Sequence, residues 1–240
     1  MYARFFSAFG PKAAPSKVNT SSLDATAPAT AADASGNVFI AWEEAQAAPL
    51  NGKIMIRRYN LNGGNPLGPV QADNNQGSGV TRHDVALAVD GAGNVIATWW
   101  EGRIDGSQPE MLFMQRLSNN LGLLGSQTQV NNPPGAPFAG QRVGQASIAT
   151  DFNNNFVIAW NADVNATNDS FPEVWTGFAK SYDSAGNVLK NDFRVDVNGR
   201  ALTGGVRVAR SSEPNTFAFA WRDNRSGHFD MYTRAVQSVP

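Results

Sequence analysis

Residues 90–99 read DGAGNVIATW, and three variants of this stretch occur elsewhere in the chain. They read DASGNVFIAW at 33–42, DFNNNFVIAW at 151–160 and SEPNTFAFAW at 212–221. The tryptophans that end them, Trp42, Trp99, Trp160 and Trp221, are separated by 57, 61 and 61 residues. A repeat of this length, built from short strand-like segments, predicts one β-sheet unit per repeat.

Each copy predicts a tight hairpin turn followed by a buried strand. Its fourth position is Gly36, Gly93, Asn154 or Asn215, and Gly and Asn are the residues that most readily accept the positive φ of such a turn. Three copies open with Asp, which can bond the backbone of its own turn. The apolar run that follows does not alternate with polar residues, which indicates a strand covered on both faces.

Composition agrees with a large all-β domain and excludes several functions. The chain has 240 residues, 42% of them hydrophobic, and it contains no cysteine, so disulfides and thiolate metal sites are excluded. A net charge of -1 gives no electrostatic reason to expect nucleic acid as a partner. No apolar run approaches the roughly 20 residues that insert into a membrane. Residues 1–6 are too short for a signal peptide, so the signal of an exported protein would lie outside this sequence.

Each repeat offers four strands in two hairpins, joined to the next repeat by polar and proline-containing segments, which is the composition of a propeller blade. We therefore predict a single β-propeller domain over residues 1–240, with about four four-stranded blades. The predicted blades cover residues 27–76, 83–132, 144–198 and 205–240, and the strands of residues 1–26 are expected to complete the last blade.

The two ends of the chain resemble each other, because residues 1–4 read MYAR and residues 231–234 read MYTR. One third strand is therefore left over when the blades are counted. Three explanations stay open at this stage: the spare strand is displaced, it pairs with a second molecule at an exposed edge, or the chain is a window of a longer array. The second would make the protein a homo-oligomer.

Residues 221–232 read WRDNRSGHFDMY and include Asp223 and Arg225. This stretch and the repeat as a whole resemble the propeller-type tandem repeats of large secreted or surface-attached bacterial adhesin-like proteins. The resemblance covers nearly the whole chain and implies a propeller in a secreted or cell-surface protein, without implying a role for any residue. The third unit departs from the pattern in its longer polar loop at 161–173.

Aromatic residues that the repeat does not require are the better candidates for ligand binding. A sugar-binding site places the apolar face of an aromatic ring beside planar polar side chains. Trp100 with Glu101 and Arg103 has that composition, and so has Trp175 with Asn165 nearby. Asp223 and Arg225 complete the predicted ligand-binding set, whereas the four repeat tryptophans are expected to fill the seams between blades.

No metal or other cofactor is predicted. The Asp-containing turns at Asp33, Asp90, Asp151 and Asp183 lack the alternate carboxylates and the late bidentate acid of a calcium loop. Plain hairpin turns explain them.

Catalysis is weighed against binding. Carboxylates do follow the tryptophan strands, at Glu43, Glu44, Glu101 and Asp223, and a glycosidase needs a pair of them. However, the sialidase signature Ser-x-Asp-x-Gly-x-x-Trp, a serine elbow and a phosphate loop are all absent. The prediction is therefore that the chain is not an enzyme and has no catalytic residue. It is predicted to be a noncatalytic extracellular binding or adhesion module for a glycan or a surface protein. The alternatives are a carbohydrate-active, glycosidase-like propeller and a structural repeat that self-associates.

Overall fold

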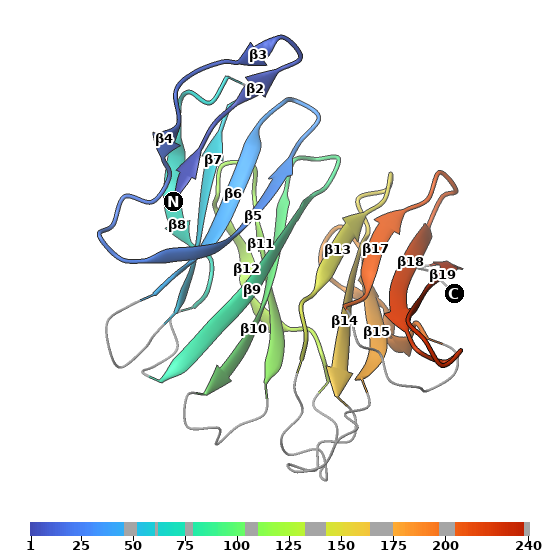
Figure 1. The fold of residues 1–240 in the computed structure, drawn as a ribbon. Coiled ribbons are helices and arrows are strands. Elements are labelled where there is room, and N and C mark those ends of the chain that lie inside the picture. The colour runs from blue at the N-terminus through green and yellow to red at the C-terminus, as the bar shows by residue number, and fades with distance from the viewer. Residues whose placement is uncertain are drawn as a thin grey trace.

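The computed structural model describes residues 1–45, 52–60, 62–74, 79–103, 110–132, 143–163, 175–196 and 205–237. Antiparallel sheets make up this part of the chain, arranged side by side as an arc (Figure 1). None of its segments is a helix long and apolar enough to cross a membrane. The predicted all-β propeller fold with four-stranded blades is confirmed.

Three sheets are complete blades, and their strands pair in chain order. The first blade consists of β5 (Ala25–Ala32), β6 (Val38–Glu44), β7 (Lys53–Tyr59) and β8 (Leu67–Gln71). The second consists of β9 (Val80–Val89), β10 (Val95–Arg103), β11 (Met111–Leu117) and β12 (Leu123–Gln129). The third consists of β13 (Ser147–Thr150), β14 (Phe156–Asp163), β15 (Trp175–Tyr182) and β16 (Val188–Arg194).

The last sheet has three strands in the described residues, β17 (Arg207–Arg210), β18 (Thr216–Asp223) and β19 (Asp230–Gln237). Two short antiparallel strand pairs open the chain, the second enclosed by the first in sequence. One pairs β1 (Tyr2–Ala3) with β4 (Ser16–Lys17), and the other pairs β2 (Phe6–Ser7) with β3 (Gly10–Pro11).

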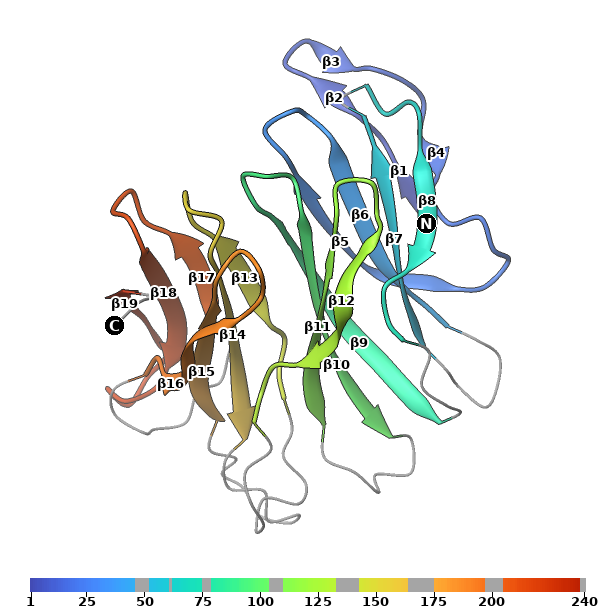
Figure 2. The same cartoon turned by 180° about the vertical axis from the view of Figure 1, so that it is seen from behind.

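The first strands of successive blades adjoin one another, β5 beside β9, β9 beside β13, and β13 beside β17. They form one side of the arc in Figure 1, and the fourth strands β8, β12 and β16 form the opposite side, which faces the viewer in Figure 2. The two ends of the arc lie apart, so the described residues do not close a ring. Pairing of β19 with a second molecule stays a prediction.

The turns before the tryptophan strands form as their sequence predicts. In the second blade Asp90 Oδ1 accepts a hydrogen bond from Asn94 N at 2.8 Å, and Asp90 Oδ2 accepts one from Asn94 Nδ2 at 3.0 Å. Equivalent pairs join Asp33 to Asn37 and Asp151 to Asn155. The fourth position of each copy has a positive φ: 81° at Gly36, 83° at Gly93, 65° at Asn154 and 53° at Asn215.

Each repeat tryptophan is buried against the sheet that precedes it. Trp99 shares an apolar cluster with Ile54 and Ile56 of the first blade. The same rule holds elsewhere: Trp42 lies with Val18, Trp160 with Leu112, and Trp221 with Val157. The tryptophan strands therefore fill the seams between blades. Because β14 is buried along its whole length, its non-alternating apolar sequence is explained by cover on both faces.

Residues 1–19 lie against the first blade, and their completion of the last blade stays a prediction. Arg57 Nη1 of the first blade donates to Val18 O at 2.7 Å. Lys180 Nζ of the third blade donates to Val130 O at 2.9 Å, in the same way. Residues 1–19 therefore occupy the place of a preceding blade. The physical reason is that Val18 finds its apolar cover at Trp42.

The turn geometry yields a stability test. Gly93→Ala places a Cβ in a left-handed conformation, 2.8 Å from Asn119 Nδ2. We expect it to lower the free energy of unfolding by about 1 kcal/mol or more. Asn154→Gly at the equivalent turn is the matched control and should leave stability equal or higher, because glycine adopts positive φ without strain. Urea unfolding measures both, and an unchanged midpoint for Gly93→Ala would contradict the turn assignment.

Candidate functional site

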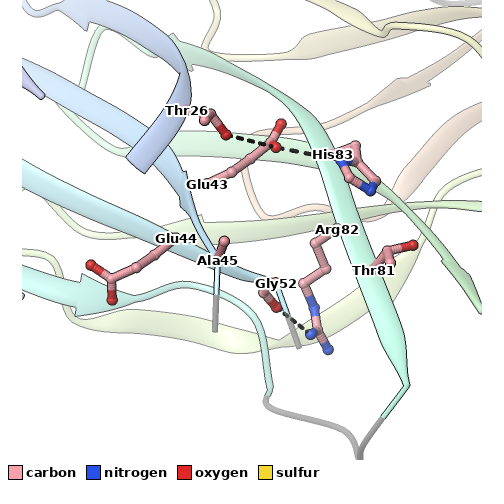
Figure 3. A pocket seen from close by; sticks show the side chains of 8 residues that line it. All are labelled: Thr26, Glu43, Glu44, Ala45, Gly52, Thr81, Arg82 and His83. Atoms are coloured by element: carbon pink, nitrogen blue, oxygen red, sulfur yellow. Dashed lines mark hydrogen bonds and ion pairs between the residues drawn. The ribbon is translucent and has the colours of Figure 1, made fainter. Parts of the chain in front are cut away.

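A pocket of about 130 Å³ lies between the first two blades, where β6 ends and β9 begins (Figure 3). Residues from both blades form its wall: Thr26, Glu43, Glu44, Ala45, Gly52, Thr81, Arg82 and His83. The wall combines two carboxylates, a guanidinium and an imidazole. It is thus the polar part of a seam that is otherwise filled by apolar side chains.

Glu43 connects the two blades. Its Oε1 accepts a hydrogen bond from Asp84 N at 2.5 Å, and its Oε2 accepts one from the Thr26 hydroxyl at 3.4 Å. Glu43 Oε2 also lies 3.4 Å from His83 Nδ1. Glu44 follows Glu43 in the strand, so its side chain leaves on the opposite side (Figure 3). Three donors therefore converge on one carboxylate that is 8% exposed.

His83, Asp84 and Trp100 form the neighbouring surface. The rings of His83 and Trp100 have centroids 4.5 Å apart, and Trp100 Nε1 donates to Asp84 Oδ2 at 3.0 Å. The pairing of β9 with β10 shifts register between Thr98 and Trp100, and Asp84 has a φ of 56°. A bulge of this kind turns side chains to new directions and often adjoins a functional site.

The pKa of His83 is raised above its ordinary value of 6.5, chiefly by its hydrogen bond to Glu43, while burial acts in the opposite direction. Protonated His83 is therefore present at mildly acidic pH beside the Glu43 carboxylate. This pair gives the site one group that holds a proton and one that accepts hydrogen bonds.

Arg82 forms the floor of the site and is 2% exposed. Its Nε donates to Glu101 Oε1 at 2.9 Å and lies 3.3 Å from Asp73 Oδ2, and its Nη1 donates to Gly52 O at 2.7 Å. Nη2 is buried and has no hydrogen-bond partner among the residues that the structure describes.

Of the residues predicted around Trp100, Trp100 itself is partly exposed. Its ring packs against the apolar cluster that the second and third blades share, and its Nε1 reaches Asp84 beside the pocket. Glu101 is buried and accepts hydrogen bonds from Trp99 Nε1 at 2.9 Å and Gln127 Nε2 at 3.1 Å, besides the one from Arg82. It holds the seam together beneath the pocket. Arg103 ends β10, and its side chain lies outside the described part.

The other predicted binding residues lie away from this pocket. Trp175 packs in the seam between the third blade and the last sheet, and Asn165 falls outside the described residues. Asp223 Oδ2 accepts from Trp221 Nε1 at 3.0 Å, and Arg225 both pairs with Asp223 and lies 3.9 Å from the Tyr232 ring centroid. The stretch 221–232 is therefore held within the last sheet by its own hydrogen bond, ion pair and cation–π contact.

His83, Asp84 and Arg82 were not predicted as site residues from the sequence. Ala27 and Asp84 are the residues with positive φ in their first strands, at 45° and 56°. They are 57 residues apart, as Trp42 and Trp99 are. A comparison of repeats would have shown Arg-His-Asp in the second blade where the first has Ala-Thr-Ala. In the described ranges, no three His, Asp or Glu side chains cluster in a way that could hold a metal ion.

The fold and its seams define a β-propeller. No family model matches the chain, and no curated protein does. Solved structures do match. A Hadza microbial sialidase aligns over 88% of this chain and 44% of its own, with 15% identity and a TM-score of 0.59. A Penicillium chrysogenum α-L-arabinanase complexed with arabinobiose aligns over 82% and 56%, with 12% identity and a TM-score of 0.54.

An endo-arabinase from Bacteroides thetaiotaomicron aligns over 95% of this chain and 80% of its own, with 13% identity and a TM-score of 0.54. The chain spans about half the length of the first two structures. At these identities the likeness establishes the fold, and no residue role is transferred from it.

The comparisons correct two expectations. The chain was expected to be a noncatalytic binding or adhesion module and not an enzyme, but the matched structures are a sialidase and arabinan-degrading enzymes. The comparisons therefore favour the carbohydrate-active alternative over the noncatalytic one. Resemblance to adhesin-like repeats stays a prediction.

The contact between Glu43 and His83 can be tested by titration. Glu43→Gln removes the carboxylate that favours protonated His83, so the pKa of His83 should fall toward 6.5. Histidine ring signals in NMR spectra report this value, and the signal of His228, the other histidine of the chain, serves as the internal control. A His83 pKa that is the same in both proteins would contradict the described geometry.

Proposed function

We propose that this chain belongs to a carbohydrate-active enzyme that hydrolyses glycosidic bonds at the seam between its first two blades. The observation that carries the proposal is the hydrogen bond from the backbone N–H of Asp84 in the second blade to the Glu43 carboxylate of the first, with the Asp84 carboxyl held by Trp100 Nε1. The propeller fold that the chain shares with glycoside hydrolases supports it.

Glycosidases place two carboxyl groups around the scissile bond, one to protonate the leaving oxygen and one to attack the sugar or activate water. Glu43 fits the charged role, because the backbone N–H of Asp84, the Thr26 hydroxyl and protonated His83 all stabilise a negative carboxylate. Asp84 supplies the second carboxyl group, and the hydrogen bond from Trp100 Nε1 to its Oδ2 fixes its orientation.

The surface beside the carboxyl groups suits a sugar ring. Pyranose and furanose rings present C–H groups on one face, and the partly exposed ring of Trp100 can cover such a face while polar groups contact the hydroxyls. A pocket of about 130 Å³ is smaller than the sites that hold whole drug-sized ligands. It suits one sugar residue at the end or in the middle of a glycan.

We include an extracellular location in the same proposal. Resemblance to secreted and surface-attached repeat proteins and a substrate that is a glycan polymer both favour a location outside the cell. The identity of the sugar is not part of this proposal, since the matched enzymes differ in the sugars that their names give.

Hydrolysis of a panel of polysaccharides, measured as the release of reducing ends, tests the proposal. Glu43→Gln and Asp84→Asn should each lower the rate on the accepted substrate about a hundredfold or more, as expected for the loss of an acid or base. Glu213→Gln, an exposed site in the last sheet's turn, should keep the full rate. Unchanged hydrolysis by both seam variants would contradict the proposal, and so would no release from any glycan by the folded protein.

A further inference from the structure

The unpartnered nitrogen of Arg82 is the feature that goes beyond a general sugar site. Arg82 is almost completely buried, lines the pocket, and has its Nη2 without a hydrogen-bond partner in the part of the chain that the structure describes. Leaving a buried charged donor unpaired costs free energy. Because the nitrogen itself is buried, a ligand acceptor reaches it through a small shift of the surrounding side chains, and the new hydrogen bond would recover that cost.

The charge of Arg82 is already compensated by its other partners. Asp73 and Glu101 lie 3.3 Å and 2.9 Å from its Nε. Glu43 and Glu44 line the same pocket. Even with His83 protonated, these four carboxylates outnumber the two cations. Arg82 therefore presents a hydrogen-bond donor in a region of net negative charge, which repels an anion.

We propose that this pocket binds an uncharged sugar residue, with a hydroxyl oxygen accepting a hydrogen bond from Arg82 Nη2, and that it discriminates against sugars that carry a carboxylate. The proposal rests on the function proposed above and specifies its substrate class. The matched enzymes include a sialidase and arabinan-degrading enzymes, so the proposal separates two possibilities that the fold leaves open.

A hydroxyl has the chemistry that the wall requires. It accepts a hydrogen bond from Arg82 through its lone pairs and can donate its own hydrogen to Glu43. An ammonium group on a sugar would suit the net negative charge but offers no acceptor to Nη2. In volume, the pocket of about 130 Å³ compares with the roughly 150 Å³ cavity that admits one six-membered ring.

Matched pairs of sugars provide the direct test. Calorimetric titration compares galactose with galacturonic acid and glucose with glucuronic acid, which differ at C6 by one carboxylate, and arabinobiose is included as an uncharged disaccharide. We expect uncharged members to bind in the millimolar range and roughly tenfold tighter than their uronates. Equal or tighter binding of the uronates would overturn the proposal, and so would binding of none of these sugars.

Two variants test the reason for the preference. Glu101→Gln and Asp73→Asn each remove one negative charge from Arg82 while keeping the size of the side chain, so each should narrow or reverse the preference for the uncharged sugar. Asp196→Asn is the matched control, because Asp196 follows the fourth strand of the third blade as Asp73 follows that of the first. It should keep the preference of the unmodified protein. If both seam variants keep it too, the account of Arg82 is wrong.

Either proposal can fail without the other. Uncharged sugars that bind with the expected preference, together with no hydrolysis of any glycan, would refute the enzymatic proposal and keep the pocket. Hydrolysis lost in Glu43→Gln, together with preferred binding of uronates, would refute the pocket proposal alone.

Discussion

The structure depends on the cover that each sheet receives from its neighbours. An apolar strand such as β14, buried at every position, can exist only between two other sheets. The repeat tryptophans provide this cover on one face of each blade, where Trp99 meets Ile54 and Ile56. Burying a side chain of this size stabilises a fold by about 3 kcal/mol. The long period of the sequence and the order of the blades both follow from this requirement.

Polar contacts between blades lie at the edges of these apolar seams. The carbonyl of Val18 is bound by Arg57, and the carbonyl of Val130 by Lys180. These bonds give hydrogen-bond donors to two backbone carbonyls that directly follow strands β4 and β12. The seam of the first two blades differs, because Arg82 and its carboxylate partners enter it beside a pocket. Bulges at Ala27 and Asp84 bend both first strands there.

The seam of the first two blades is proposed as the site because it brings together polar residues from both blades. Glu43 and Asp84 lie 41 residues apart and come from different blades. Their contact exists only because the blades are packed against each other. A site made in this way requires no insertion into the repeat, only the substitution of a few residues on strands that the fold already positions.

The sequence was sufficient for the local structure and for the fold class. The Asp-x-x-Gly-Asn turns and the tryptophan seams could be predicted because each depends on neighbours within one repeat. Contacts between repeats could not be predicted, such as the cover of Val18 by Trp42. Among the predicted binding residues, Glu101 and Asp223 carry charges that pair with Arg82 and Arg225. The repeat motif does not determine whether such a carboxylate faces solvent or pairs with a buried arginine.

The central claim is that the seam of the first two blades is the carbohydrate site. The most direct measurement follows the indole N–H signals of the six tryptophans by NMR as arabinobiose or galactose is added. The account predicts that the signal of Trp100 shifts with saturation, because its N–H is bonded to Asp84 beside the pocket, while the signals of Trp175 and Trp221 stay in place. A shift confined to Trp175 or Trp221, with Trp100 unchanged, would contradict it.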